Sequence, residues 1–317
     1  MKVSILIPYY NAEKFIVQCA RSLFEQSYQN IEYIFVDDCS NDHTTDILRQ
    51  VIKSYHTKQI KILRNSTNKG VSETRNILLK ESTGDYIYFV DSDDFIEKNA
   101  IEVFVNIARA HNADIVRCCY NEISSHTLKA ITNSCWTNKS ELLSQTIGSH
   151  NQIDAMWKLF IRRNLIINRH IFFEKGFNAC EDYVMSVKLF HFADTVIDIP
   201  NYLYNYCIHN NNVSITKQPQ SFIKDMIKAS DSVFHFLKQQ NIYYKYKTEI
   251  NQRILISKQP YLLNKNYLNI NQYLSFHPET NTIWRNFKYG LREKILFLLA
   301  EYNCKFTIKL LYKFILK

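Results

Sequence analysis

The residues with the clearest capacity for chemistry are Asp91-Ser92-Asp93-Asp94, which directly follow an apolar run at 86–90. Three carboxylates within four residues repel one another unless a cation or N–H groups compensate their charge. Oxygen ligands of this kind suit Mg²⁺ or Mn²⁺, ions that also bind the oxygens of a diphosphate. The alternative is a polar loop that caps a helix, and an isolated Asp-x-Asp pattern does not decide between the two.

The elements that must position these residues alternate between strand and helix. Short β-branched runs at 3–8, 31–36, 60–63 and 86–90 predict strands, and apolar residues at helical spacing follow the first three of them. We expect Asn11 to cap the first of these helices, Gly70 to lie in the turn before the third, and Gly84 to end it. This alternation predicts an α/β fold with a mostly parallel sheet flanked by helices.

Polar clusters follow three of the predicted strands: Tyr10-Asn11, Asp37-Asp38 and Asp91-Ser92-Asp93. In parallel sheets, ligands bind beyond the carboxyl ends of the strands. We therefore expect these clusters to share one binding site.

The rest of the chain is less regular. A helix at 100–111, a strand at 114–120 and a helix that opens at Glu181-Asp182 are the clearer elements, and the pattern after 222 is mostly helical. We expect a catalytic domain at 1–220, with a nucleotide-sugar half at about 1–97 and an acceptor half at about 98–220. A helical C-terminal region would occupy 221–317.

Composition excludes several classes of protein. The 317 residues are 46% hydrophobic and 22% charged, which excludes a disordered chain. The eight cysteines form no CxxC pair, and no signal peptide or apolar run long enough to span a membrane is evident, so we expect a cytoplasmic protein with reduced thiols. The net charge of +9 favours anionic partners.

Seven segments together resemble one enzyme family. They are VSILIPYYNAEKFI, YIFVDDCSNDHT, NKGVSETRN, GDYIYFVDSDD, AMWKLFIRRNL, ACEDYVMSVKLF and LYNYCIHNNNVSIT, and they span residues 1–216. In order and spacing they resemble the signatures of family 2 of the GT-A glycosyltransferases, which move a sugar from a nucleotide diphosphosugar to an acceptor hydroxyl. The last three segments look closest to bacterial lipooligosaccharide β-1,3-galactosyltransferases.

The resemblance implies a role for particular residues. Asp182 would be the general base, Asp93 a metal ligand, and His209 a further contact to the metal or diphosphate. Asp38 would accept a hydrogen bond from uracil, and Asp91 would lie at the ribose. The nucleotide-binding residues would be Pro8, Tyr10, Asn11, Asp38, Arg75, Asp91 and Ser92, and the acceptor residues Glu181, Trp157 and Lys158.

Several of these roles have a structural alternative. Glu181 and Asp182 could stabilise a helix N-terminus through the helix dipole. An adjacent Glu181 and partial burial could instead raise the pKa of Asp182 toward the operating pH, as a base requires. Trp157 could be a core residue beside a snorkelling Lys158, and His209 could be exposed and uninvolved.

The resemblance thus implies an inverting hexosyltransferase that uses Mn²⁺ or Mg²⁺. UDP-galactose is the first donor, ahead of UDP-GalNAc, UDP-GlcNAc and UDP-glucose, and the acceptor is a glycan or glycolipid of lipooligosaccharide, O-antigen or capsule. Lys305, Lys309, Lys313 and Lys317 recur every fourth residue, which favours an amphipathic helix on the anionic inner face of the cytoplasmic membrane. The alternative is a solvated helix packed on the catalytic domain.

Two other classes of function stay open. Positive charge alone suggests nucleic-acid binding, but no nucleic-acid motif is present and we expect no such partner. A catalytically silent UDP-binding scaffold is the other, although Asp38, Asp91, Asp93 and Asp182 are all intact.

Overall fold

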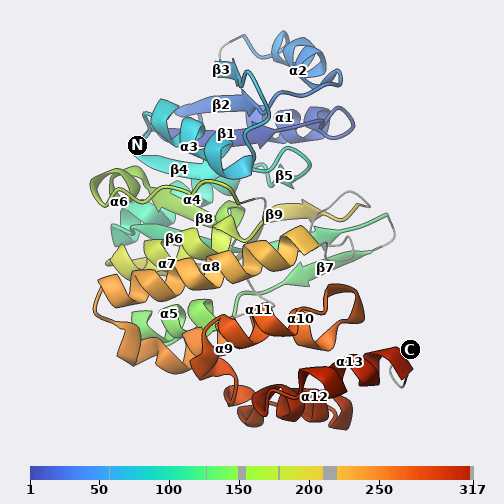
Figure 1. Ribbon diagram of the computed structural model, residues 1–317. Coiled ribbons are helices and arrows are strands. Elements are labelled where there is room, and N and C mark those ends of the chain that lie inside the picture. The colour runs from blue at the N-terminus through green and yellow to red at the C-terminus, as the bar shows by residue number, and fades with distance from the viewer. Residues whose placement is uncertain (57, 126, 149–154, 178, 210–219, 315–317) are drawn as a thin grey trace. The chain divides into compact units, whose positions relative to one another are not determined.

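The computed structural model describes residues 1–56, 58–125, 127–148, 155–177, 179–209 and 220–314. The chain forms two compact units (Figure 1). The first unit comprises Met1–Leu143 and Asp154–Thr216, and the second comprises Ser144–Ile153 and Lys217–Lys317. Among the described residues, no helix is long and apolar enough to cross a membrane.

The first unit is built on a single sheet. Its strands are β1 (Val3–Tyr9), β2 (Ile31–Asp37), β3 (Gln59–Arg64), β4 (Tyr86–Phe89), β5 (Phe95–Ile96), β6 (Ile115–Ile123), β7 (Leu128–Ile131), β8 (Leu159–Arg162) and β9 (Val196–Cys207). They lie in the order β3-β2-β1-β4-β8-β6-β9-β5, with β7 paired to β6. The β1–β2, β2–β3, β1–β4 and β6–β9 pairs are parallel, whereas β8 and β5 run antiparallel to their neighbours. The predicted α/β fold with a mostly parallel sheet is confirmed.

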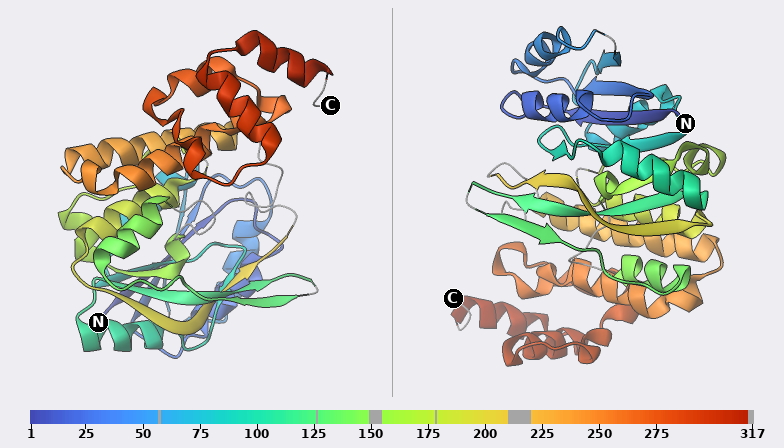
Figure 2. Two further views of the ribbon diagram at one scale, coloured as in Figure 1. Left: turned by 90° about the horizontal axis from the view of Figure 1, so that it is seen from below. Right: turned by 180° about the vertical axis from the view of Figure 1, so that it is seen from behind.

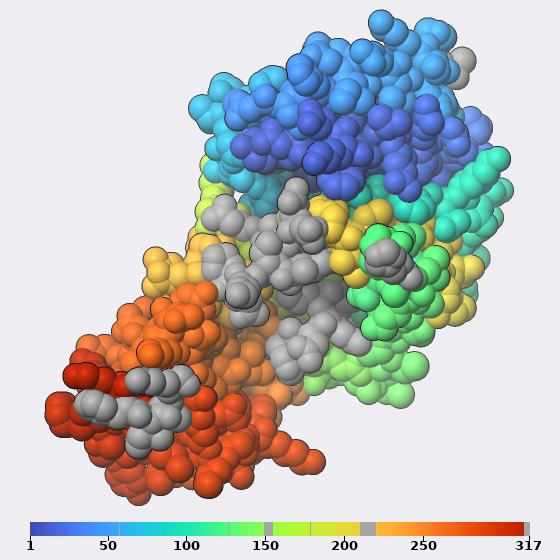
Figure 3. Space-filling view, turned by 90° about the vertical axis from the view of Figure 1, so that its right-hand side faces the viewer, coloured from blue at the N-terminus to red at the C-terminus, as the bar shows by residue number. Residues whose placement is uncertain are grey.

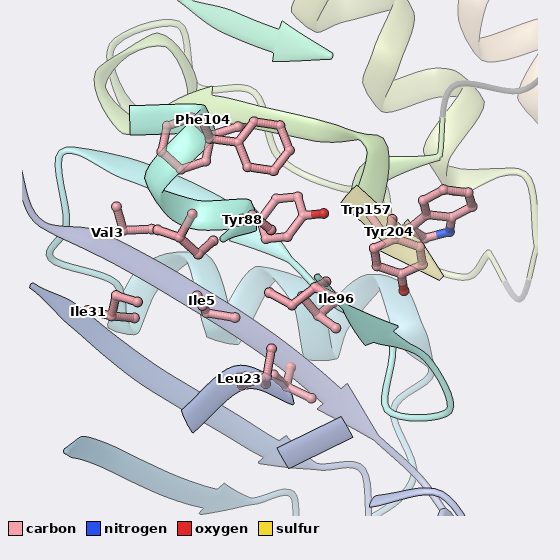
Figure 4. Close-up of a cluster of buried hydrophobic side chains, with 14 of the residues drawn as sticks. Val3, Ile5, Leu23, Ile31, Tyr88, Ile96, Phe104, Trp157 and Tyr204 are labelled. Carbon is pink, nitrogen blue, oxygen red and sulfur yellow. The ribbon is translucent and has the colours of Figure 1, made fainter. Parts of the chain in front are cut away.

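Helices cover both faces of this sheet (Figure 1). They are α1 (Ile16–Phe24), α2 (Thr44–Ile52), α3 (Val71–Glu81), α4 (Ala100–His111), η1 (Met156–Lys158), α6 (Arg163–Asn168) and α7 (Glu181–Phe192), while α5 (Lys139–Gly148) begins in the first unit and ends in the second. Val3 and Ile5 of β1 pack with Leu23 of α1 and Phe104 of α4 in one buried cluster (Figure 4). Helix α3 contacts β1 and β2, and its Leu78 is fully buried. The apolar runs of β1, β2 and β4 are therefore buried on both faces, as in other parallel sheets, whereas β3 at the edge of the sheet is partly exposed.

Two local predictions are wrong. Asn11 does not cap α1, because that helix begins at Ile16 after Phe15, and Asn11 instead adopts a left-handed conformation with φ 49°. Gly84 does not end α3, which stops at Glu81. Its lack of a side chain serves a close approach, since a Cβ at this position would lie 2.6 Å from Oγ of Ser4.

The second unit is helical over its described residues, as expected for the C-terminal region (Figure 2). Its elements are α8 (Gln220–Gln239), η2 (Tyr243–Tyr246), α9 (Lys247–Lys258), α10 (Pro260–Leu263), η3 (Lys265–Tyr267), α11 (Ile270–Ser275), η4 (Pro278–Thr280), η5 (Ile283–Asn286), α12 (Leu291–Glu301) and α13 (Lys305–Phe314). Buried Lys258 ties α9 to the segment after α11 by donating to the carbonyl oxygens of Phe276 and His277 and to Oδ1 of Asn281.

Candidate active site

The three polar clusters lie at one edge of the first unit's sheet. Tyr9, the last residue of β1, pairs in register with Asp37, the last residue of β2, and Leu6 pairs with Phe89 at the end of β4. Because these strands are parallel, the residues that follow them emerge on the same side. Tyr10 and Asn11 are exposed there, whereas Pro8 and Ser92 are buried.

Asp38 is buried and holds the loop that leads into α3. Its Oδ1 accepts hydrogen bonds from Nδ2 of Asn65 and the backbone N–H of Lys69, both at 2.8 Å, and its Oδ2 accepts one from the N–H of Gly70. A carboxylate has about four acceptor positions, and hydrogen bonds from the described residues fill three of them. The predicted contact with uracil stays a prediction.

Asp93 pairs with His209, the last described residue after β9. Nε2 of His209 lies 2.8 Å from Oδ2 of Asp93, and the imidazole ring stacks on Phe15 with ring centroids 4.5 Å apart. Burial raises the pKa of Asp93, the charge of Asp91 raises it further, and His209 opposes both. The sequence pointed to both members of this pair but not to Phe15, since an aromatic residue near a helix start has no distinctive pattern.

Asp94 links the end of β9 to the loop of residues 91–94 after β4, which we call the acidic loop. One of its oxygens accepts a hydrogen bond from the Tyr204 hydroxyl at 2.6 Å, and the other accepts one from the N–H of Cys207 at 2.7 Å. The Tyr204 hydroxyl in turn accepts from the N–H of Asp91. Sequence reasoning missed this connection, which spans more than a hundred residues and carries His209 toward Asp93.

Arg75 joins the acidic loop to the start of α7. Its Nη1 donates to Oε1 of Glu181 at 2.7 Å and to Oδ1 of Asp182 at 2.6 Å, and its Nη2 donates to Oδ1 of Asp91 at 3.1 Å. The guanidinium also lies near the rings of Phe89 and Phe173. Burial acts to lower the pKa of Arg75, but the charges of Asp182, Asp91 and Glu181 outweigh it and raise that pKa.

Asp182 has the environment of a proton acceptor. Burial raises its pKa to about 7, and Glu181 and Asp91 add to the increase, whereas Arg75 and the N–H of Met156 oppose it. Its position in the first turn of α7 also favours the charged form. The effects that favour the proton outweigh those that favour the carboxylate, so the pKa of Asp182 lies well above the ordinary aspartate value.

Trp157 and Lys158 belong to η1, next to Asp182. The Trp157 ring stacks on Tyr204, with centroids 4.3 Å apart (Figure 4). It also makes a T-shaped contact with the ring of Tyr120. Trp157 is 8% exposed and Lys158 6%. The burial of Trp157 matches the packing alternative, whereas Lys158 is itself buried, with its Nζ over the Tyr120 ring, and does not snorkel. Contact of either residue with an acceptor stays a prediction.

Over the part of the chain that the structure describes, no three His, Cys, Asp or Glu side chains form a metal-binding group. Asp93 and His209 nevertheless provide one oxygen and one nitrogen donor side by side. A half-buried carboxylate whose pKa is raised by burial and by a second carboxylate gains from a nearby cation, so these residues fit Mn²⁺ or Mg²⁺.

Comparison with known proteins identifies the family. The family model described as glycosyl transferase family 2 matches residues 4–173, more than half of the chain. The chain belongs to glycosyl transferase family 2. The resemblance drawn from the sequence motifs is thus confirmed at the level of the family.

Two glycosyltransferases are among the proteins of similar sequence. The uncharacterized glycosyltransferase EpsJ of Bacillus subtilis (strain 168) is 27% identical over 267 residues, 82% of this chain and 77% of EpsJ. The poly(ribitol-phosphate) β-N-acetylglucosaminyltransferase TarS of Staphylococcus aureus (strain MW2) is 26% identical over 210 residues. That match covers 65% of this chain but only 35% of TarS.

Solved structures share the fold. Residues 1–349 of S. aureus TarS in complex with UDP-GlcNAc match with a TM-score of 0.60 and 20% identity, covering 95% of this chain and 79% of the TarS chain. The mannosyltransferase PcManGT of Pyrobaculum calidifontis, in complex with GDP-Man and Mn²⁺, matches with a TM-score of 0.52 and 15% identity, covering 94% and 79%. At these identities the likeness establishes the GT-A-like α/β fold.

Proposed function

We propose that this family 2 glycosyltransferase moves a hexose from a UDP-sugar to a hydroxyl of a cell-surface glycan or glycolipid, with inversion at the anomeric carbon. The observation that carries the proposal is the environment of Asp182. Its pKa is about 7, and Arg75 links it to Asp91 of the acidic loop. A base that titrates near neutral pH suits removal of a proton from a hydroxyl group.

In the proposed step, the acceptor oxygen forms a bond to the anomeric carbon while the bond from that carbon to the diphosphate oxygen breaks. UDP leaves with the bonding electron pair, and Asp182 takes the proton of the acceptor hydroxyl. Attack opposite the leaving group converts an α-linked donor into a β-linked product. We assign Glu181, which lies beside Asp182 and pairs with Arg75, to contact with the acceptor.

We propose that the donor binds at the carboxyl ends of β1, β2 and β4. Tyr10 and Asn11 are exposed there, and Asp38 accepts three hydrogen bonds from the described residues. We assign the nucleoside to Pro8, Tyr10, Asn11 and Asp38, the ribose to Asp91 and Ser92, and the acceptor side to Trp157 and Lys158. Arg75 is then a positioning residue between the donor and acceptor halves.

Asp93 and His209 would hold a divalent cation, Mn²⁺ or Mg²⁺. When bound, this cation supplies positive charge against the departing diphosphate. The Mn²⁺ in the structure of PcManGT supports divalent metal use in this fold.

Galactose is the donor sugar that we favour, from the resemblance of residues 155–216 to lipooligosaccharide β-1,3-galactosyltransferases. N-acetylglucosamine is the second candidate, because TarS is named as an N-acetylglucosaminyltransferase and has been solved with UDP-GlcNAc. We propose that residues 1–97 bind the donor and 98–220 the acceptor, and that the enzyme works in the cytoplasm at the inner face of the membrane.

UDP release from a panel of UDP-sugars tests the proposal. Each donor is incubated with Mn²⁺ or with EDTA, in the presence and absence of galactose- and GalNAc-terminated acceptors. We expect one donor to give acceptor-dependent, metal-dependent release, with a β-anomeric product by NMR. Retention of the α configuration would refute inversion, and no release with any UDP-sugar would refute the donor class.

A further inference from the structure

Two apolar stripes cover the outer sides of α12 and α13 in the second unit. Ten large hydrophobic side chains are exposed among the described residues, and six of them lie between 291 and 310. These six, which we call the C-terminal apolar stripes, are Leu291, Ile295, Leu298, Tyr302, Phe306 and Leu310. The red C-terminal residues form part of the surface of this unit in Figure 3.

The stripe on α12 lies opposite the side that packs inside the unit. Residues 291, 295, 298 and 302 are spaced by four, three and four, so they fall on one side of the helix. Leu296, Phe297 and Ala300, on the other side, are at most 1% exposed. Helix α12 is therefore apolar on two sides, and only one of these sides packs against the rest of the second unit.

The same arrangement recurs on α13. Ile308 is fully buried and Tyr312 is 3% exposed, with its hydroxyl donating to the carbonyl oxygen of Leu262. Phe306 and Leu310 lie on the opposite side and are 74% and 38% exposed. One side of α13 thus packs within the second unit and the other side is open, so the predicted membrane contact stays a prediction. Lys317, the last lysine of the predicted face, lies outside the described residues.

Positive charge surrounds the stripes. Arg292, Lys294, Lys309 and Lys313 are exposed, and residues 285–317 contain eight Lys or Arg against two Glu. Both acidic side chains are engaged: Glu293 accepts from the N–H of Gly290, and Glu301 pairs with Arg285. Exposed apolar side chains with a net excess of cations match the interface of an anionic bilayer.

We propose that the C-terminal apolar stripes are a docking surface for an anionic membrane. Apolar side chains would enter the interface, and the neighbouring lysines and arginines would meet lipid phosphates. Tyrosine suits this position because its ring is apolar and its hydroxyl polar. Pairing of two copies through this surface is disfavoured, because a symmetric contact would bring the same cations together.

Vesicle co-sedimentation of the full chain tests this surface. Vesicles of phosphatidylcholine alone are compared with vesicles that also contain phosphatidylglycerol, at low and high salt. We expect binding only to the anionic vesicles, weakened by salt. The double variant Leu291→Ser/Phe306→Ser should lower the partition coefficient by at least about tenfold, and Lys309→Gln/Lys313→Gln should lower it and reduce its salt dependence.

Matched controls separate this surface from general surface chemistry. Leu128→Ser/Tyr244→Ser changes exposed apolar residues outside the stripes, and Lys53→Gln/Lys98→Gln changes exposed lysines elsewhere. Both should bind like the unmodified chain. Equal binding to neutral vesicles, equal loss in the controls, or no binding to anionic vesicles would overturn the proposal. A dimer that Leu291→Ser/Phe306→Ser disperses, without vesicle binding, would assign the stripes to self-association instead.

This inference does not depend on which sugar is transferred. Turnover of a soluble acceptor, measured on the same variants, should stay unchanged, because none of the substituted residues belongs to the proposed active site. Loss of vesicle binding with turnover retained therefore tests the docking surface alone.

Discussion

Nη1 of Arg75 lies 2.6 Å from Oδ1 of Asp182, although the two residues are 107 positions apart in the chain. The same guanidinium reaches Glu181 and Asp91, so one cation lies among three carboxylates. It limits how far burial raises the pKa of the proposed base, and it ties the acidic loop after β4 to the N-terminus of α7.

The rate of transfer should depend on pH through Asp182. A general base acts only when deprotonated, and the pKa of Asp182 is about 7. We therefore expect kcat/KM to increase as pH rises, with an acidic limb centred near 7, measured by acceptor-dependent UDP release between pH 5 and 9. A limb near the ordinary aspartate value of about 4 would contradict the proposed environment.

The same shift should affect stability with a definite sign. Because the pKa of Asp182 is raised from 3.8 to about 7 on folding, the folded protein binds the extra proton within that window and loses stability as pH increases through it. Asp182→Asn removes this dependence. The unfolding free energy of the variant minus that of the unmodified chain should grow between pH 4 and 8, by roughly 4 kcal/mol at most. Thermal unfolding of both proteins checks it, and a difference independent of pH would contradict it.

Arg75→Lys should move the acidic limb upward. A lysine is a single compact charge and cannot bridge three carboxylates as the guanidinium fork does. Because the lysine would counteract the effect of burial on Asp182 less than Arg75 does, the pKa of Asp182 should increase. The acidic limb then shifts above 7, and the rate at neutral pH falls. Arg49→Lys, a substitution at an exposed arginine, is the matched control and should leave the profile unchanged. An unshifted limb in Arg75→Lys would show that Arg75 has no influence on the base.

Asp94→Asn should weaken the metal site without touching a ligand. One amide nitrogen would face either the Tyr204 hydroxyl or the N–H of Cys207, and leaving a buried donor unsatisfied costs about 1–3 kcal/mol. Since β9 leads to His209, we expect a lower Tm together with a higher half-saturating Mn²⁺ concentration. Asp46→Asn, at an exposed site, is the control. A lower Tm with an unchanged Mn²⁺ response would reduce Asp94 to a purely structural role.

Removal of the metal or of its proposed ligands should have related effects. EDTA should abolish UDP release, and Mn²⁺ or Mg²⁺ should restore it. His209→Gln should raise the half-saturating Mn²⁺ concentration by at least about tenfold, the loss typical even for residues that only support a metal ligand. Asp93→Asn should do the same or more. Full activity in EDTA would exclude Asp93 and His209 as metal ligands that the reaction needs.

The sequence predicted the part of the fold from β1 to β4, in which strands and helices alternate regularly. Strands at 3–8, 31–36, 60–63 and 86–90 agree with β1 to β4 within one residue at each end. The runs of β1, β2 and β4 are buried on both faces and leave a clear apolar pattern, and the run of β3 is recognisable although this edge strand is partly exposed. The polar clusters at their carboxyl ends followed from the geometry of parallel sheets. Beyond β4, antiparallel strands break the alternation of strand and helix, and the order of the strands in the sheet could not be predicted from their spacing in the sequence.

Contacts between side chains that are distant in the sequence could not be predicted from it. The sequence indicated Arg75, Asp91 and Asp182 separately, through their motifs, but nothing in it showed that one guanidinium contacts both carboxylates. Asp94 and Tyr204 were missed for the same reason, since a hydrogen bond between residues 110 positions apart depends on how β9 packs. The charge balance that decides the pKa of Asp182 exists only in the folded chain.

The most direct test of the central claim is acceptor-dependent UDP release by the unmodified chain and by Asp182→Asn, with Mn²⁺ and the donor that the panel identifies. We predict a loss of roughly 10²–10⁴-fold in kcat for Asp182→Asn with UDP binding retained, and no loss for Asp46→Asn. An Asp182→Asn protein that binds UDP and turns over at the unmodified rate would contradict the assignment of Asp182 as the base.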